Sequence, residues 1–306
     1  MKNFLQTFLV FSFVFLGCNT NNGNQPPVIV KLPARTAVAT SQNNEDRKFD
    51  YDLKNPLHTW KLPNQLQEVS GNTWVDKDHL ILIEDIHPNL YLIKTRDNNA
   101  ELEKTIPFQK EEKDKFDIED VTIENNIVYA LWSHGTLFKI DNWNSNPHTD
   151  GIKTSLSKNN NTEGLCYDPV TKSLLIACKN QSGLQDEKKS TKAVYQFNLE
   201  TKKLEEKPFL VIHKKDFEEL TDDKLDFNPS AIAVHPVTHE LYLLSTLDNK
   251  CMAVFNRDGK LISFQFIDAD LMPQPEGICF SPEGKLYISS EGKKGEAPNL
   301  FEFDPK

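Results

Sequence analysis

A short motif that recurs five times along the 306 residues constrains the fold most. The copies are EVSGNTWV (68–75), DIEDVTIE (117–124), NTEGLCYD (161–168), NPSAIAVH (228–235) and QPEGICFS (274–281). Aligned on their third residues, they are separated by 49, 44, 67 and 46 residues. Each copy leads through a tight turn into a second and then a third apolar strand, and turns such as DPVTKS and SPEGK carry residues typical of hairpins. Small antiparallel sheets at this spacing predict a β-propeller with blades of roughly 40–50 residues.

Small and large residues alternate within each copy, which indicates how the first strands pack. The positions one and three after the aligned residue are mostly small, whereas the positions between and beyond them are mostly large and apolar. A period of two places these sets on opposite faces of a strand. Innermost strands crowd around a propeller axis, so one face must be small. Asp120 departs from this pattern and is therefore a candidate for a special polar role.

The ends of the repeat region predict how the ring closes. The fifth copy is followed by two further strands before the chain ends at Lys306, so its blade lacks a fourth strand. Residues 49–63 precede the first copy and have the character of a strand, so we expect them to complete the last blade and remove an open edge. A six-bladed alternative would need its extra blade within residues 213–226, which lack a strand pattern and predict an inserted helix or loop. We therefore predict an all-β, single five-bladed propeller over residues 49–306.

The first residues predict export and lipid anchoring. A 13-residue apolar run after Lys2 is too short to span a bilayer, so residues 1–17 are interpreted as a signal peptide. Gly17 directly before Cys18 resembles the lipobox of bacterial lipoproteins, in which the Cys is acylated. The alternative is an ordinary signal peptide cleaved nearby. Residues 18–48 are rich in Asn, Gln, Pro and Thr and predict the lipidated Cys with a disordered tether, which would hold the propeller at a bacterial membrane, inner or outer.

Charge and cysteine usage narrow the possible partners. The formal net charge of −10 argues against nucleic acid and anionic lipid as main ligands. Cys166, Cys178 and Cys279 lie within predicted core strands, so we expect buried free thiols rather than disulfides. We also expect a monomer.

Several of these segments together carry a family resemblance. LQEVSG (66–71), IEDV (118–121), TEGLCYDPVTKSLLIA (162–177) and above all PQPEGICFSPEGKLYISSEG (273–292) make the chain similar to the SdiA-regulated, YjiK-like proteins. That resemblance implies an exported bacterial propeller over about residues 50–306. It also implies a distant similarity to propeller phytases and lactonases, with a link to calcium regulation in some members.

Two polar rings are predicted where the first strands begin. The aligned residues are Ser70, Glu119, Glu163, Ser230 and Glu276, and the residues two places earlier are Glu68, Asp117, Asn161, Asn228 and Gln274. All ten side chains carry an oxygen and should meet at one mouth of the axial channel. Oxygen ligands with several carboxylates suit calcium, so we name Glu68, Asp117, Glu119, Glu163 and Glu276 as candidate calcium ligands. The alternative is that these groups cap strands and bind water.

The ends of the second strands should open at the same mouth. They contribute Asp85 and Glu291 as candidate acids, Lys179 as an anion contact and Trp132 as a stacking wall, with Asn161, Asn228 and Gln274 as further ligand contacts. The alternative is a solvated loop rim. No GxSxG, Walker-type, HExxH or CxxC motif occurs, so a serine or thiol hydrolase has no support.

Two functions from different classes remain open. The first is a membrane-anchored, extracytoplasmic binding module without catalysis that presents the mouth to a small molecule or protein and holds calcium in the channel. The second is a calcium-dependent phosphoesterase or lactonase. A phytase-like site should gather several Lys and Arg around phosphate, whereas the predicted mouth offers a few Lys and no Arg. The shortage of cationic side chains favours the binding module over the phosphoesterase.

Overall fold

The computed structural model describes residues 49–96, 99–110, 116–185, 190–218, 221, 225–247 and 249–306. The predicted signal peptide, Cys18 and the tether lie outside these residues. Within the ranges described, no helix has the length and apolar character needed to cross a membrane.

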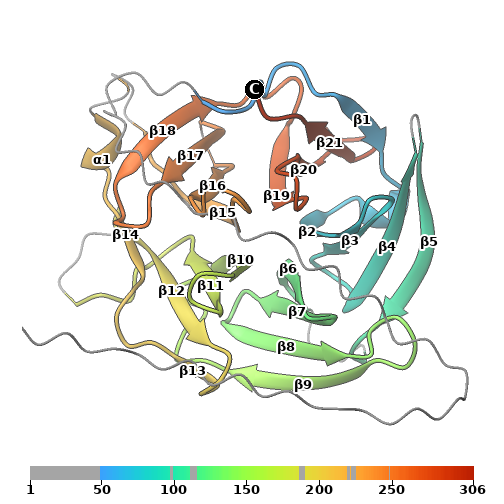
Figure 1. Ribbon diagram of the computed structural model, residues 1–306, viewed down its shortest axis with the longest axis horizontal. Coiled ribbons are helices and arrows are strands. Elements are labelled where there is room, and N and C mark those ends of the chain that lie inside the picture. The colour runs from blue at the N-terminus through green and yellow to red at the C-terminus, as the bar shows by residue number, and fades with distance from the viewer. Residues whose placement is uncertain are drawn as a thin grey trace, which may run out of the picture. The chain divides into compact units, whose positions relative to one another are not determined.

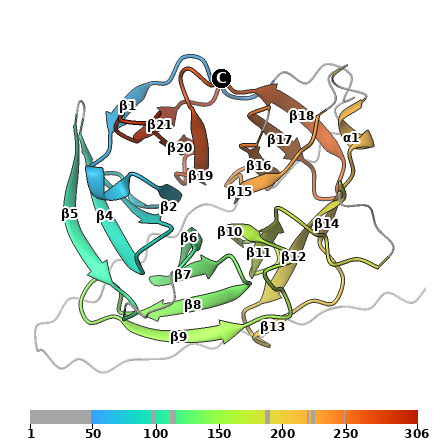
Figure 2. The same cartoon turned by 180° about the vertical axis from the view of Figure 1, so that it is seen from behind.

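Five antiparallel sheets are arranged around a central axis, as Figures 1 and 2 show from opposite sides. The first blade contains β2 (Val69–Asp76), β3 (His79–Glu84), β4 (Asn89–Arg96) and β5 (Asn99–Pro107). The second contains β6 (Ile118–Glu124), β7 (Ile127–Trp132), β8 (Thr136–Asp141) and β9 (His148–Lys153). The third contains β10 (Thr162–Asp168), β11 (Ser173–Cys178) and β12 (Lys192–Asn198), with the short strands β13 (Lys203–Leu204) and β14 (Leu210–Ile212) both paired to β12.

The last two blades complete the ring. The fourth contains β15 (Pro229–Val234), β16 (Leu241–Ser245), β17 (Cys251–Phe255) and β18 (Leu261–Phe266). The fifth has the order β1-β21-β20-β19, with β1 (His58–Lys61), β19 (Gln274–Phe280), β20 (Leu286–Glu291) and β21 (Asn299–Phe303). The prediction of a five-bladed propeller is confirmed.

Two weaker sequence signals have definite structures. Residues 213–226, which a six-bladed fold would have needed as strands, contain the single helical turn α1 (Lys215–Glu218), whose Phe217 is buried. The fourth strand of the second blade is β9, and it pairs along the whole of β8. Its sequence is mostly polar because most of its side chains are exposed at the rim. A 3₁₀ turn, η2 (Asn64–Leu66), joins β1 to the first blade.

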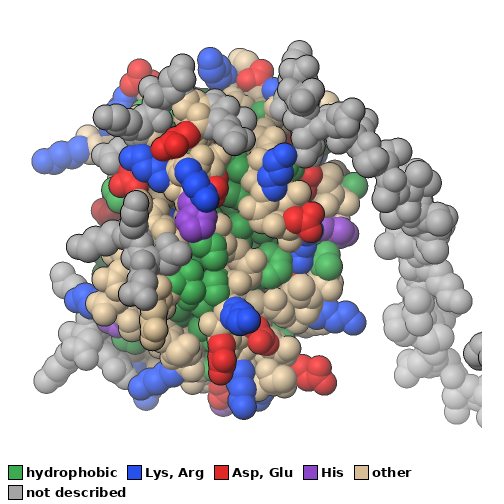
Figure 3. Space-filling model, turned by 90° about the vertical axis from the view of Figure 1, so that its left-hand side faces the viewer, with side chains coloured by type: hydrophobic (Ala, Val, Ile, Leu, Met, Phe, Trp, Pro, Cys, Tyr) green, Lys and Arg blue, Asp and Glu red, His purple; other side chains and the backbone are tan. Residues whose placement is uncertain are grey.

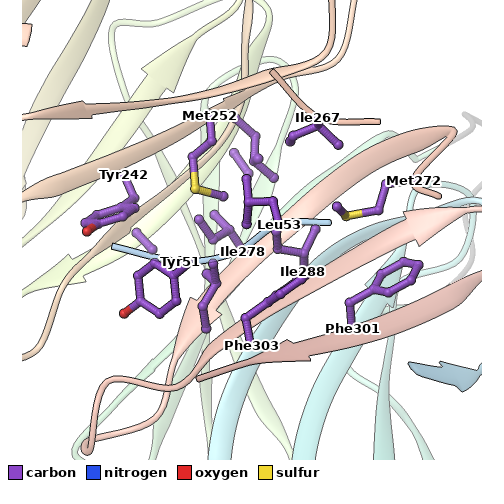
Figure 4. Packing of buried hydrophobic residues seen from close by; sticks show 14 of the residues in the cluster. Tyr51, Leu53, Tyr242, Met252, Ile267, Met272, Ile278, Ile288, Phe301 and Phe303 are labelled. Atoms are coloured by element: carbon purple, nitrogen blue, oxygen red, sulfur yellow. The ribbon is translucent and has the colours of Figure 1, made fainter. Parts of the chain in front are cut away.

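The N-terminal segment closes the ring as predicted. β1 pairs antiparallel with β21, and Tyr51 forms a bridge with Pro305. Figure 4 shows Tyr51 and Leu53 packed in one apolar cluster with Phe301, Phe303 and other buried side chains of the last two blades. The Tyr51 hydroxyl donates a 2.6 Å hydrogen bond to the Gly284 carbonyl. The first and last parts of the propeller therefore share one core.

Close contact between neighbouring inner strands explains the column of small residues. A Cβ added at Gly71 would lie 2.7 Å from Cα of Asp120 in the next blade, and one at Gly164 would lie 2.9 Å from the amide nitrogen of Ile232. Such distances leave no room for a side chain. Asp120 is accommodated because its carboxyl group accepts hydrogen bonds from the amides of Val121 (2.8 Å) and Leu165 (2.7 Å), which ties the second blade to the third. Its polar role is structural.

Cys166, Cys178 and Cys279 are buried free thiols, as predicted, and Cys251 is a fourth. On the flank shown in Figure 3, acidic and basic side chains are interspersed around a strip of hydrophobic ones.

Candidate functional site

A β-bulge lies at the same place in all five inner strands. The pairing of each inner strand with the second strand of its blade skips one residue near its start. The skipped residues are Ser70, Glu119, Glu163, Ser230 and Glu276. A bulged residue is released from the ladder, and its side chain is redirected. The column that the sequence alignment singled out is thus a ring of five bulges at one end of the propeller axis.

Three of these bulged residues are glutamates that interact with one lysine. The Lys179 ammonium, which follows β11, donates a 2.8 Å hydrogen bond to Oε2 of Glu163. Asn161 donates through Nδ2 to the other oxygen, Oε1, at 2.5 Å. Glu119 and Glu276 lie close enough to Lys179 and Glu163 to perturb their ionisation. We call Glu119, Glu163, Glu276 and Lys179 the acidic mouth.

Burial and mutual repulsion raise the pKa of every glutamate in the acidic mouth. Burial is the largest cause for Glu276, whose pKa rises to about 8 although Lys179 opposes the shift. The pKa of Glu119 is raised further, by burial and then by Glu163 and Asp117. Burial alone would lower the pKa of Lys179, but the nearby carboxylates outweigh it and raise that pKa. The 2.8 Å contact with the Lys179 ammonium favours the ionised form of Glu163, whereas burial raises the pKa of the same carboxyl group.

A second group of acids adjoins the acidic mouth. Burial, followed by the charges of Glu68, Glu84 and Asp117, raises the pKa of Asp85 to about 6. The pKa of Glu291 rises to about 7 through burial and the charges of Glu68 and Asp85. Gln274 donates a 2.8 Å hydrogen bond to Glu291 through Nε2. The structure therefore brings together all five predicted calcium ligands together with Asp85, Lys179 and Glu291.

Other predicted residues make no hydrogen bond to these acids among the described contacts. Asn228 is part of its own loop, where its amide bonds to Ser245 and its side chain to the Asp226 carbonyl. The Ser70 hydroxyl donates to the Ile118 carbonyl of the next blade, and the Ser230 hydroxyl shares a hydrogen bond with the Thr246 hydroxyl. The side chains at these two bulges are therefore engaged in structural contacts. Trp132 stacks on His134 with ring centroids 5.2 Å apart. Its role as a ligand wall stays a prediction.

One functional cation escaped the sequence reasoning. Lys192, the first residue of β12, is buried and donates through Nζ to the backbone carbonyls of Lys179 (2.7 Å) and Asn180 (3.3 Å). Lys192 thereby fixes the backbone of Lys179, whose side chain is part of the acidic mouth. A lysine at the start of a third strand has no distinguishing sequence signal, so only the contact reveals it.

The described residues do not form a ready-made metal site. No three Asp, Glu, His or Cys side chains among them are placed to hold one ion. An ammonium group, that of Lys179, already provides the positive charge beside Glu163. Calcium binding by these glutamates stays a prediction, and it would require Lys179 to withdraw.

The sequence profile of one protein family matches residues 57–303, nearly the whole propeller. The chain belongs to the SdiA-regulated family. The resemblance noted in the sequence is confirmed, and the acidic mouth lies entirely within the part that matches this family. No curated protein sequence matches the chain significantly.

Solved structures similar to this SdiA-regulated propeller share its fold at low sequence identity. A glutaminyl cyclase from Myxococcus xanthus is 13% identical, with a TM-score of 0.53 over 82% of this chain and 96% of that one. A protein of unknown function from Bacteroides thetaiotaomicron is 16% identical, with a TM-score of 0.51 over 76% of this chain and 58% of that one. The PQQ-bound aldose sugar dehydrogenase from Streptomyces coelicolor is 10% identical, with a TM-score of 0.51 over 82% and 98%. At such identities the likeness extends to the fold alone.

Proposed function

We propose that this SdiA-regulated propeller is an extracytoplasmic binding module, held at a membrane through Cys18, whose acidic mouth takes up a cationic ligand. The observation that carries the proposal is the fivefold bulge, which places the buried Glu163 and the partly buried Glu119 and Glu276 in one cluster with Lys179. Carboxyl groups with raised pKa values gain from a further positive charge, because it lets them ionise without repulsion.

The preferred ligand is an organic ammonium group. Lys179 shows that an ammonium fits between these carboxylates, at 2.8 Å from Glu163. An external ammonium could take its place or bind Glu119 and Glu276, which make no hydrogen bond to Lys179 among the described contacts. Calcium is the second candidate, supported by the number of carboxylate oxygens and weakened by the presence of Lys179.

A hydrolase has less support from the same geometry. The lysines near the mouth are already engaged, since Lys192 bonds to two carbonyls, Lys250 donates to the Thr246 carbonyl and Lys293 pairs with Asp270. A phosphate ester would meet more carboxylates than free cations there. This favours binding of a cation over hydrolysis of a phosphate ester.

Thermal unfolding of residues 49–306 with added putrescine or calcium chloride tests the proposal. Binding to the folded state should raise the melting temperature with ligand concentration, by the equivalent of about 2.7 kcal/mol at a hundred times Kd. Sodium chloride of equal ionic strength controls for screening. The double substitution Glu163→Gln and Glu276→Gln should remove the ligand-dependent rise, while Glu283→Gln, at an exposed site, should preserve it. If neither putrescine nor calcium chloride raises the melting temperature more than sodium chloride of equal ionic strength does, the proposal is wrong.

A further inference from the structure

The turn that follows each inner strand begins with the last residue of the motif copy, and in the fourth blade this residue is a histidine. In the third blade it is Asp168, which accepts a hydrogen bond from the Val170 amide at 3.2 Å. In the fifth blade it is Ser281, which accepts one from the Lys285 amide at 3.2 Å. Both acceptors keep this role around neutral pH. His235 differs, because an imidazole takes up a proton in the physiological range.

The hydrogen bonds of His235 specify a neutral ring. Nδ1 accepts hydrogen bonds from the amides of Val237 at 3.2 Å and Thr238 at 3.1 Å, so Nδ1 carries no proton. Nε2 lies 3.0 Å from the Tyr51 hydroxyl, which already donates its one hydrogen to the Gly284 carbonyl at 2.6 Å. Nε2 is therefore the donor in that contact. The neighbouring groups thus select one tautomer of an uncharged imidazole.

A second proton on the ring conflicts with these contacts. It would have to sit on Nδ1, where it would face the two amide N–H groups and abolish both of their hydrogen bonds. The ring has little room to turn, because it packs against Tyr242 and Phe280 with ring centroids 5.7 Å and 5.0 Å away. A Cβ added at Gly284 would lie only 3.4 Å from Nε2. Protonation therefore requires the turn or Tyr51 to separate from the ring.

Two carboxylates near His235 attract a charge on the ring without removing this conflict. Asp50 accepts a hydrogen bond from the Tyr242 hydroxyl at 3.0 Å, and Glu240 accepts one from the Thr238 hydroxyl at 2.9 Å. Their attraction leaves the two amide N–H groups facing Nδ1, so it offsets only part of the cost of the proton. The other titratable or charged side chains of the surrounding elements are His239 in the same turn, Lys306 beside Asp50, and Glu283 and Lys285 on either side of Gly284.

Tyr51 connects this histidine to the closure of the ring. Tyr51 is fully buried, lies in the segment that leads into β1, and forms a bridge with Pro305 at the other end of the chain. We propose that His235 is a pH-sensitive latch on residues 49–57. In its neutral form the imidazole holds this segment against the last two blades, and its protonation below about pH 6.5 releases the segment.

Hydrogen exchange of residues 19–306, which include the whole propeller, tests the latch. A released histidine has a pKa of about 6.5, so between about pH 7.5 and about pH 5.5 the released state gains about tenfold over the latched state. The latch is therefore strongest above this pKa and weakens as the pH falls. After correction for the intrinsic effect of pH, exchange at residues 49–57 should become about tenfold faster over this interval, while exchange at β11 should keep its rate.

His235→Asn provides a variant without the titrating group. Its side-chain oxygen can accept from the same two amides, as in an Asx turn, but it does not titrate. Because it also lacks the contact with Tyr51, residues 49–57 should exchange faster than in wild type at about pH 7.5 and show no further tenfold increase at about pH 5.5. His148→Asn, at an exposed histidine, should keep the response of the wild type.

The ring nitrogen resonances of the wild type decide the matter if His235→Asn fails to fold. At about pH 7.5 the proton of His235 should lie on Nε2, and the ring should stay neutral in folded molecules at about pH 5.5. The proposal is overturned if this proton lies on Nδ1, if exchange at residues 49–57 does not accelerate in acid, or if exchange at β11 accelerates equally. A tenfold response that persists in His235→Asn also overturns it.

Discussion

Substituting Glu276 by Gln should flatten the pH dependence of stability. Its pKa is about 8 in the folded protein against an ordinary 4.5, so the folded state binds more protons than the unfolded state between these two values. Stability must therefore fall as pH rises through this interval. At about 1.36 kcal/mol for each tenfold change in proton affinity, the full interval corresponds to an upper limit of about 5 kcal/mol.

The actual fall in the free energy of unfolding should be smaller than this limit, because Glu119 and Lys179 share the charge of the cluster. Between about pH 5 and about pH 8, we expect the ionisation of Glu276 to lower the unfolding free energy of the wild type by about 2–3 kcal/mol. The Glu276→Gln variant should not show this decrease. Urea unfolding of residues 49–306 at several pH values measures it, with the exposed Glu283→Gln as matched control. A constant difference in unfolding free energy between Glu276→Gln and wild type at all pH values would show that the carboxyl group does not titrate in this window.

Three further outcomes are expected. Cys18→Ala should move the full-length protein from the detergent phase to the aqueous phase, and unchanged partitioning would refute the anchor. Deleting residues 49–63 removes β1 and should lower the melting temperature strongly, whereas deleting residues 19–45 should leave it unchanged; equal melting temperatures would contradict closure by β1. Asp120→Ala leaves the Leu165 amide without its acceptor and should cost about 1–3 kcal/mol in urea unfolding, against little change for Glu124→Ala.

The fold could be predicted from the sequence because each blade repeats the same local pattern. Five copies of one strand motif, with hairpin turns after them, leave few architectures other than a propeller. The missing strand after residue 303 and the surplus strand before residue 64 together predicted closure by β1. Polar β9 was harder to place because an exposed outermost strand does not need the apolar alternation that marks the inner strands.

The site was predictable in its residues but not in its geometry. Alignment found Glu119, Glu163 and Glu276, yet a bulge depends on how two strands pair, which the inner strand alone does not encode. The ion pair between Lys179 and Glu163 also depends on side-chain reach across a blade. A cavity of about 660 Å³ lined by all five blades went unnoticed because residues in its wall, such as Trp74, Tyr167 and Phe280, look like ordinary core positions in the sequence, and only their partial exposure distinguishes them.

Closure by β1 has a consequence for the order in which the protein can fold. Residues 58–61 must pair with residues 299–303, so this contact cannot form until almost the whole chain has left the ribosome. Pairings between residues so far apart in the sequence close late and slow the folding rate. The first blades can assemble earlier, as hairpins of neighbouring strands, but the ring they form remains an open arc. The final step of folding is therefore the pairing of β1 with β21. A chain that ends before residue 299 lacks β21 and cannot close the ring.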